Sequence, residues 1–216
     1  MTIIKDKKKS QSLFNFNQNQ GINNINPQLS TITQKYYQQI ICQDLVLKQR
    51  YNNIMELPTI NKIVINTTSS LFVQDKKYLV PALLALEFLT GQKIKYTNAK
   101  KSIATFKIRQ NQIIGCKITL RNQYMYNFFS KFILIIAPRL SDFSGITKKN
   151  IKNSGDYTYG VQNIMIFPEI ENHYELFSTC RGLNITFSIS NGKTNHAFLL
   201  YSAFQLPTSH KVVVTT

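Results

Sequence analysis

Basic side chains alternate with hydroxyl and apolar ones in the segment NAKKSIATFKIRQN, residues 98–111. Ammonium and guanidinium groups bind phosphate oxygens, and hydroxyls and aromatic rings add hydrogen bonds and stacking in RNA-binding loops. The segment therefore predicts an exposed phosphate-binding loop. Its candidate contacts are Lys100, Lys101, Ser102, Lys107 and Arg109. An ordinary exposed hairpin is the alternative, and for Phe106 alone we expect that alternative, with its ring in the core.

Side chains that could run an enzyme reaction are poorly arranged. The three histidines lie near the C-terminus without metal-binding spacing, and the three cysteines include no CxxC pair. His173 and Cys180 form the only candidate nucleophile pair, and Glu169 and Glu171 lack the facing partner that acid–base catalysis requires. No glycine-rich nucleotide loop occurs. We therefore expect no catalytic residue, no metal and no cofactor.

The charge of the chain points to a polyanionic partner. The 216 residues include 26 Lys and Arg against 10 Asp and Glu, which gives a formal net charge of +16. Between Glu87 and Asp142 there is no acidic residue, although that interval is rich in lysine and arginine. Such regional concentration is typical of phosphate binding, whereas a solvated basic face without a partner is the plainer alternative.

Two strand-like segments would place part of this charge on one surface. In INKIVIN, residues 60–66, Ile63 and Ile65 point to one side and Lys62 and Asn66 to the other, because side chains alternate across a strand. The segment at 113–121 alternates in the same way. Its polar set is Gly115, Lys117, Thr119 and Arg121. Each strand therefore has one apolar face and one basic, polar face.

The remaining elements complete a mixed fold. Further strands are expected at 93–97, 106–109, 163–170 and 183–190, helices at 31–51, 75–88, 125–138 and 197–204, and a loop at 141–163. Strand groups and separate helices without βαβ repetition predict an α+β fold, a single domain at 31–207. Residues 1–30 are expected to be a flexible extension rich in Asn, Gln and Lys, and 208–216 a C-terminal tail. No apolar run is long enough for a membrane span.

Two of the helices carry specific expectations. The first is expected to bury the apolar stripe made by Ile32, Tyr36, Ile40, Leu47 and Tyr51. In the second, Asp75 is the expected cap and Thr90-Gly91 the stop. Pro81 should kink this helix or move its start downstream, because proline has no backbone N–H to donate.

From Tyr36 to Pro207 the chain resembles the large-ribosomal-subunit protein five family, the 5S rRNA-binding proteins of the central protuberance. The resemblance rests on a series of motifs in the family's order. They are LTGQK (89–93), NAKKSIATFKIRQ (98–110), IGCKITLR (114–121), PRLSDFSG (138–145), GDYTYGV (155–161), IFPEI (166–170) and RGLNI (181–185).

The resemblance implies a mainly antiparallel sheet with helices on one side and a concave face that binds 5S rRNA. The implied 5S rRNA contacts are Lys62, Asn66, Gln92, Lys95, Lys117, Thr119 and Arg121. It also implies that the loop at 98–110 touches P-site tRNA. Residues 142–160 resemble the region that meets a small-subunit protein in an intersubunit bridge. The bridge candidates are Asp142, Phe143, Gly145, Lys148, Lys149 and Tyr157.

The chain departs from the family pattern in three places. Asn66 to Ser70 stand where bacterial members have a glycine-rich turn, Ser144 replaces an arginine, and Asn184 replaces an aspartate. The N-terminal extension has no counterpart in compact bacterial members, which favours a mitochondrial over a plastid ribosome. Two alternatives remain: a mitochondrial ribosomal protein that binds large-subunit rRNA and neighbouring proteins without 5S rRNA, and an RNA-modifying enzyme.

Overall fold

The computed structural model describes residues 27–49, 51–141, 143–180 and 182–208. Within them, five strands form one antiparallel sheet in the order β2-β3-β1-β5-β4. The strands are β1 (Thr59–Thr68), β2 (Lys95–Asn98), β3 (Ile113–Leu120), β4 (Tyr157–Val161) and β5 (Leu183–Ser190). The two alternating segments of the sequence therefore become neighbours, with Ile63 opposite Leu120.

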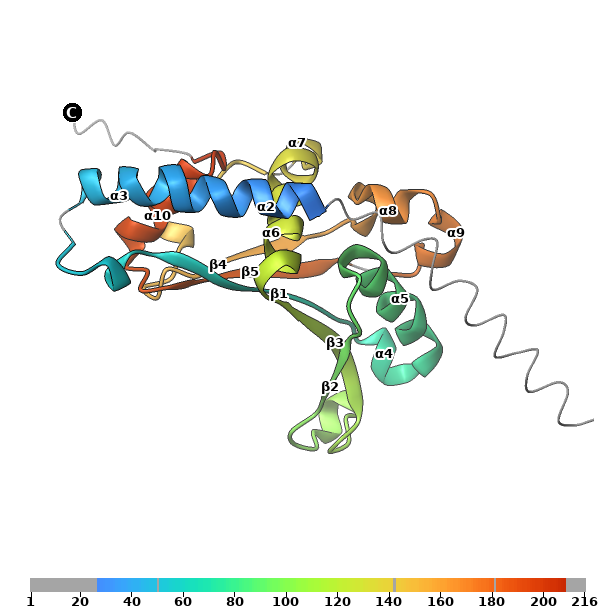
Figure 1. Cartoon of the computed structure of the whole chain (residues 1–216). Coiled ribbons are helices and arrows are strands. Elements are labelled where there is room, and N and C mark those ends of the chain that lie inside the picture. The colour runs from blue at the N-terminus through green and yellow to red at the C-terminus, as the bar shows by residue number, and fades with distance from the viewer. Residues whose placement is uncertain (1–26, 50, 142, 181, 209–216) are drawn as a thin grey trace, which may run out of the picture.

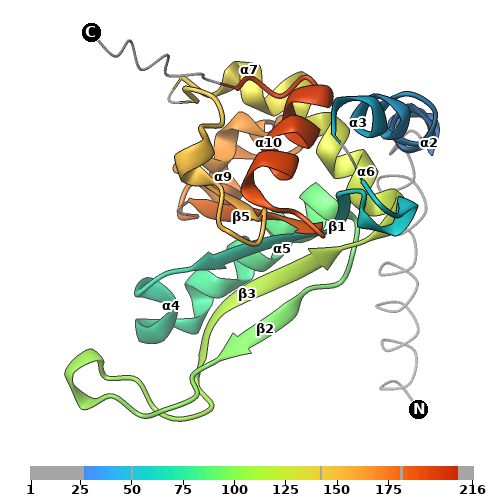
Figure 2. The same ribbon diagram turned by 90° about the vertical axis from the view of Figure 1, so that its left-hand side faces the viewer.

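The helices cover one face of this sheet, and the other face is open and concave (Figure 1). Strands β2 and β3 continue past the helix layer and project as a hairpin from one end of the molecule (Figure 2). This arrangement confirms the α+β fold with an antiparallel sheet and helices on one side. The open concave face is thus a consequence of strands that are apolar on one side only.

Aromatic rings dominate the core between sheet and helices. Phe187 of β5 is fully buried, and its ring centroid lies 5.7 Å from that of Phe129, 5.1 Å from Phe132 and 6.2 Å from Tyr157. Ile63 and Ile65 of β1 are buried beside it. The alternation read from the sequence is therefore confirmed for β1 and β5.

The N-terminal helix is one continuous rod made of α2 (Pro27–Tyr36), a π-helical turn (Tyr37–Ile41) and α3 (Cys42–Lys48). It begins four residues before the expected start, at a proline, which fits the first turn of a helix because its missing N–H would have no partner there. Residues 1–26 of the expected extension and 209–216 of the expected tail lie outside the described residues.

The buried face of this helix differs from the expected one. Tyr37, Ile41 and Leu45 are buried, and the Tyr37 hydroxyl donates to the Pro58 carbonyl at 3.0 Å. By contrast, Ile32 and Leu47 are 60% and 85% exposed. The helix carries apolar residues on two faces, so spacing alone selected the wrong one.

Pro81 sets the start of the next long helix. The chain passes through α4 (Leu71–Gln74) and a 3₁₀ turn (Lys76–Tyr78) before α5 (Leu79–Thr90) begins. Pro81 is the third residue of α5, where no intrahelical donor is needed. The expected downstream start is confirmed, and Asp75 makes no side-chain cap. Gly91 ends α5 in the left-handed conformation, with φ of 67°.

The third helical rod crosses the sheet at its centre. It consists of α6 (Asn122–Lys131), a π-helical turn (Phe132–Ile136) and α7 (Ala137–Arg139). Pro138 was expected to stop it, but α7 runs one residue further. Proline cannot donate to the carbonyl four residues earlier, and the wider π turn just before it accommodates the missing bond. The closing helix is α10 (Thr194–Ala203).

Three expected elements were wrong. Residues 163–170 form a 3₁₀ turn (Ile164–Ile166) and α8 (Pro168–Glu171), followed by α9 (Tyr174–Phe177), because Pro168 starts a helical turn and cannot donate within a sheet. The expected loop at 141–163 contains β4. Residues 106–109 form no strand, since Lys107 adopts φ of 56° after a 3₁₀ turn (Ala104–Phe106). Two more 3₁₀ turns lie at Ile54–Glu56 and Lys148–Asn150.

Candidate nucleic-acid interface

The concave face is built from the residues of each strand that point away from the helices. Its members are Lys62, Val64, Asn66 and Thr68 of β1, Lys95 and Thr97 of β2, Gly115, Lys117 and Thr119 of β3, Thr158 and Gly160 of β4, and Asn184, Thr186 and Ser188 of β5. The antiparallel register aligns one row across all five strands. This row reads Lys95, Lys117, Asn66, Asn184 and Gly160. A polar strip therefore crosses the whole sheet.

The charge of the concave face has one sign. None of its members is acidic, and its three lysines form no ion pair within the described residues. Threonine and serine hydroxyls lie between the lysines, and Thr158 and Thr186 hydrogen-bond each other at 3.2 Å. Ammonium groups with neighbouring hydroxyls and amides match phosphate and ribose oxygens. The surface can therefore bind a nucleic-acid backbone.

Five of the seven expected 5S contacts share this face, namely Lys62, Asn66, Lys95, Lys117 and Thr119. The other two lie beside it. Arg121 is exposed at the junction of β3 and α6, where its Nη1 donates to Asn61 Oδ1 at 3.3 Å. Gln92 is half-buried in the turn between α5 and β2.

Sequence reasoning missed the far half of the face. The alternation of β5 could have predicted three of its members. Asn184, Thr186 and Ser188 alternate with the buried residues of that strand, so they must lie on the opposite face. Thr158 and Gly160 were hidden because β4 was expected to be loop. The face is thus wider than the expected contact set.

Gly115 lies on the concave face where β3 passes close to β1. A Cβ added here would stand 2.4 Å from the Thr67 carbonyl oxygen, which belongs to the neighbouring strand's backbone. Gly115→Ala is therefore expected to lower the free energy of unfolding by about 1–3 kcal/mol, because the strands must separate locally. Urea denaturation followed by circular dichroism measures this. An unchanged midpoint would mean that the strands adjust without cost.

The hairpin loop between β2 and β3 is shaped by its own hydrogen bonds. The amide of Ala99 donates to Gln112 at 2.8 Å, and Ile103 and Ile108 pair through both of their amides. The Gln112 side chain donates to the Val73 carbonyl at 3.0 Å, which ties the base of the loop to α4. The projecting hairpin is therefore anchored at its base and open at its tip.

All five expected phosphate contacts of this loop are exposed, namely Lys100, Lys101, Ser102, Lys107 and Arg109. The Ser102 hydroxyl donates to the Ile108 carbonyl at 3.1 Å, so its one proton is used to shape the loop. Phe106 was expected in the core, but its side chain is 70% exposed. The 3₁₀ turn and the left-handed Lys107 set the direction of this ring, which lines a pocket together with Thr68 of β1 and Val73 of α4.

The expected bridge residues separate into exposed and buried ones. Lys148 and Lys149 are exposed on the 3₁₀ turn, with Lys148 Nζ 5.4 Å from the centre of the Phe198 ring. Phe143 is half-buried against Tyr159, at 5.2 Å between ring centroids. Gly145 is buried with φ of 89°. Asp142 lies outside the described residues.

Tyr157 is a correction to that set. Only 2% of its surface is exposed, and its ring stacks on Phe187 and meets Tyr201 edge-on. Burial raises the pKa of its hydroxyl to about 12, with Tyr159 adding to the effect. As the first residue of β4 it points toward the helices, so it supports the core and presents nothing to a partner.

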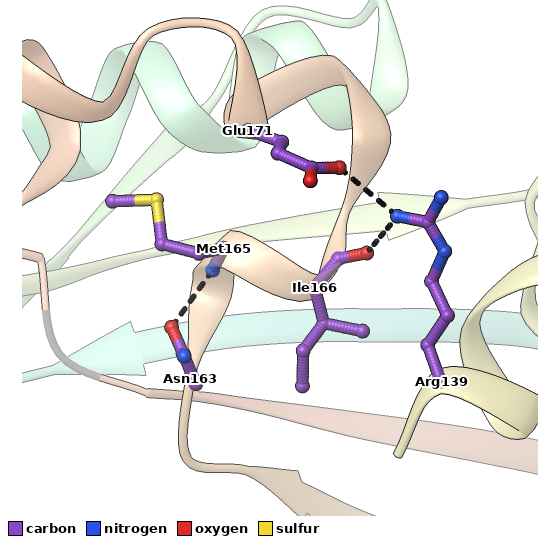
Figure 3. Close-up of polar contacts among 5 residues, drawn as sticks. All are labelled: Arg139, Asn163, Met165, Ile166 and Glu171. Carbon is purple, nitrogen blue, oxygen red and sulfur yellow. Dashed lines mark hydrogen bonds and ion pairs between the residues drawn. The ribbon is translucent and has the colours of Figure 1, made fainter.

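The carboxylates weighed as catalytic candidates form ion pairs instead. Lys131 Nζ lies 2.6 Å from Glu169 Oε1, and Arg139 Nη1 lies 3.1 Å from Glu171 Oε2. Figure 3 shows that Arg139 also reaches the Ile166 carbonyl, at 3.4 Å, while Asn163 Oδ1 accepts from the Met165 amide at 3.0 Å. These contacts fasten α8 to the third helical rod. Both glutamates therefore have structural partners in the fold.

The thiol candidate is equally unsuited to catalysis. Burial raises the pKa of Cys180 to about 11, so the thiol stays protonated near neutral pH. The His173 ring lies against Phe88, with 5.8 Å between centroids. The described residues contain no group of His, Cys, Asp or Glu that could hold a metal. In the same part of the chain, no helix has the length and apolar character needed to cross a membrane.

Two family models match the chain in succession. Residues 53–109 match the model described as ribosomal protein L5, and residues 113–208 match the model for the C-terminus of the same ribosomal family. Together they cover β1 to α10, which includes every strand of the concave face and the projecting hairpin.

Curated relatives agree with the family models. A large ribosomal subunit protein uL5m of Prototheca wickerhamii is 48% identical over 192 residues, which cover 82% of this chain and 83% of the relative. The uL5m of Reclinomonas americana is 39% identical over 173 residues (80% and 95%), and the uL5 of Polynucleobacter asymbioticus is 41% identical over 179 residues (83% and 98%). The mitochondrial relatives support a mitochondrial ribosome as the location. The chain therefore belongs to the ribosomal protein L5 family, whose members are structural constituents of the large ribosomal subunit and not enzymes.

Proposed function

We propose that the concave face binds 5S rRNA and so anchors it in the central protuberance of the large subunit. The observation that carries this proposal is the row of lysines and amides that crosses all five strands without an acidic side chain. A curved polar surface of this kind suits the backbone of a structured RNA, which is recognised by shape and by phosphate and 2′-hydroxyl contacts.

The projecting hairpin contacts P-site tRNA in the same proposal. Its basic tip is exposed, and its base is held by the Gln112 bond to Val73. Lys100, Lys101, Lys107 and Arg109 supply charge to the tRNA backbone, which carries no sequence information. Contacts of this type tolerate a tRNA that differs in every elongation cycle.

Lys148 and Lys149 are the exposed candidates for an intersubunit bridge to a small-subunit protein, with Asp142 and Phe143 retained from the expected set. Both lysines are exposed on a 3₁₀ turn that faces away from the core. The buried members of the expected set, Gly145 and Tyr157, shape the neighbouring backbone and core. A bridge built on flexible lysine side chains can adjust as the subunits rotate.

Ultraviolet crosslinking of intact mitochondrial ribosomes, followed by sequencing of the RNA attached to this chain, tests the proposal. We expect a 5S rRNA crosslinked to peptides of β1, β3 and β5, and tRNA crosslinked to residues 98–111. Large-subunit rRNA alone on the concave face would favour a ribosome without 5S rRNA. The absence of any RNA on these peptides would overturn both assignments.

Binding should also depend steeply on salt. Lys62, Lys95, Lys117 and Arg121 together can neutralise four phosphates. Each neutralised phosphate contributes about 0.7–0.9 to the slope of log affinity against log salt, so the expected slope is roughly −3. Filter binding to 5S rRNA between 50 and 200 mM salt measures it. Lys117→Gln should reduce the slope by about one phosphate's share, and a flat response would exclude a phosphate-dominated interface.

A further inference from the structure

A second exposed surface lies on the helix side of the molecule. Helix α5 presents Val80, Leu84 and Phe88 to solvent, and their spacing of four residues places them on one stripe. Their exposed fractions are 53%, 41% and 49%. Helix α9 packs against α5 and adds two further exposed apolar side chains, Tyr174 and Leu176, which are 65% and 60% exposed. We call these five side chains the α5–α9 patch.

Phe88 joins the two helices of the patch. Its ring centroid lies 5.8 Å from that of His173 and 6.0 Å from that of Phe177, the buried residue of α9. One edge of the Phe88 ring is therefore fixed in the fold while about half of its surface remains exposed. A rigid, half-exposed aromatic ring between apolar neighbours is typical of protein interfaces.

The charges around this patch differ from those of the rest of the chain. Glu87 of α5 and Glu175 of α9 are exposed beside it, and neither forms an ion pair within the described residues. Glu171 is nearby but is held by Arg139. Lys76 and Lys77 flank the start of α5, before Val80, and the exposed Lys93 follows its end, past Gly91. In a chain with 26 basic and 10 acidic residues, two carboxylates without an ion pair beside the apolar stripe are a local exception in sign.

These two carboxylates indicate which class of molecule could bind the patch. Carboxylates repel phosphates, so RNA is disfavoured at the α9 end, and apolar side chains gain nothing from a phosphate backbone. Helices α5 and α9 also lie on the helix side of the sheet, away from the concave face (Figure 1), so RNA bound to that face would leave them uncovered. A contiguous apolar surface with a charged rim normally marks contact with another protein.

We infer that the α5–α9 patch docks a segment of another ribosomal protein that carries apolar side chains together with lysine or arginine. The apolar side chains cover the stripe from Val80 to Phe88 and reach Tyr174. The basic groups pair with Glu87 and Glu175. The partner needs both the apolar side chains and the basic groups. Exposed ion pairs alone contribute little binding energy, and apolar contacts alone do not select a basic partner.

Carbodiimide coupling on intact ribosomes tests this directly, because it joins a carboxylate only to a lysine amine in contact with it. We expect mass spectrometry to find Glu87 or Glu175 joined to a lysine of a different ribosomal protein, in a segment that contains apolar residues. The exposed carboxylate of Asp44 on α3 is the control, since it lies outside the patch and should give no such product.

A charge reversal separates this docking from chance proximity. Leu84→Arg should reduce the coupled product about tenfold, as expected for one central interface residue, while ribosomes still incorporate the chain. Gln39→Arg adds the same charge at an exposed position of the N-terminal helix and should leave the yield unchanged. Coupling only within this chain or to a second copy, ultraviolet crosslinks from the patch to rRNA, or no coupling at all would each overturn the inference.

Discussion

Lys117→Glu combined with Arg121→Glu is expected to weaken 5S rRNA binding roughly 100-fold or more, because two charge-assisted contacts are lost and two repulsive charges appear. Both side chains are exposed at the basic end of β3. Neither supports the core, so the fold should be unaffected. Filter binding with 5S rRNA at fixed salt measures the affinity, and far-ultraviolet circular dichroism checks the fold.

Lys148→Glu combined with Lys149→Glu is the matched control. It makes the same change in net charge at two exposed residues that lie off the concave face. If binding depended only on the total charge of +16, both double variants would lose affinity equally. A loss confined to the first pair therefore locates the interface, and equal losses would contradict it.

Phe187→Ala is expected to lower the free energy of unfolding by about 3–5 kcal/mol. This ring is completely buried and lies against Phe129, Phe132 and Tyr157, so its removal leaves a cavity that aromatic neighbours cannot close. Such a loss is a large fraction of the total stability of an ordinary domain. Equilibrium urea denaturation measures it.

Phe106→Ala provides the comparison for the core variant. The same residue type is removed, but at a side chain that is 70% exposed on the hairpin tip. The expected change in stability is within about 0.5 kcal/mol, as for most surface substitutions. A large loss of stability in Phe106→Ala, or a small one in Phe187→Ala, would contradict the assignment of Phe187 to the core and of Phe106 to the surface.

The strands that form the centre of the interface were readable from the sequence. Ile63 and Ile65 of β1, and Cys116, Ile118 and Leu120 of β3, recur at every second position, so one face must be buried. The opposite face includes Lys62, Asn66, Lys117 and Thr119. Period-two alternation is a local signal that tertiary packing rarely overrides. The outer half of the face depends on β4, which also alternates but is only five residues long and lies among glycines and lysines, so it was expected to be loop.

The buried side of other elements could not be predicted from the sequence, because it depends on tertiary contacts. The N-terminal helix has apolar side chains on two faces. Tertiary contacts, such as those of Tyr37 with Phe204 and Pro58, decide that Tyr37 and Ile41 are buried while Leu47 is not. Tyr157 has the polar hydroxyl of a surface residue, yet its place at the start of β4 turns it inward. The resemblance to the family implied a role for a stretch of chain, but not the direction in which each of its side chains points.

The ends of the sheet explain how a protein with one uncovered sheet face avoids pairing with itself. Edge strands expose unpaired backbone groups that can capture a strand of another molecule. Here the edge strand β2 has four residues, a register shift between Thr97 and Asn98, and an exposed Lys95 at its start. Short length, irregularity and lysine each discourage edge-to-edge association.

Lys95 therefore has one role in the free protein and, in the proposed complex, a second role. Before assembly its charge discourages edge-to-edge pairing with another molecule, and in the proposed complex the same charge faces RNA. An apolar residue at position 95 would still allow the strand to form, but it would neither discourage edge pairing nor offer a charge to RNA. The newly made chain would then be most vulnerable in the interval between its synthesis and its incorporation into the subunit.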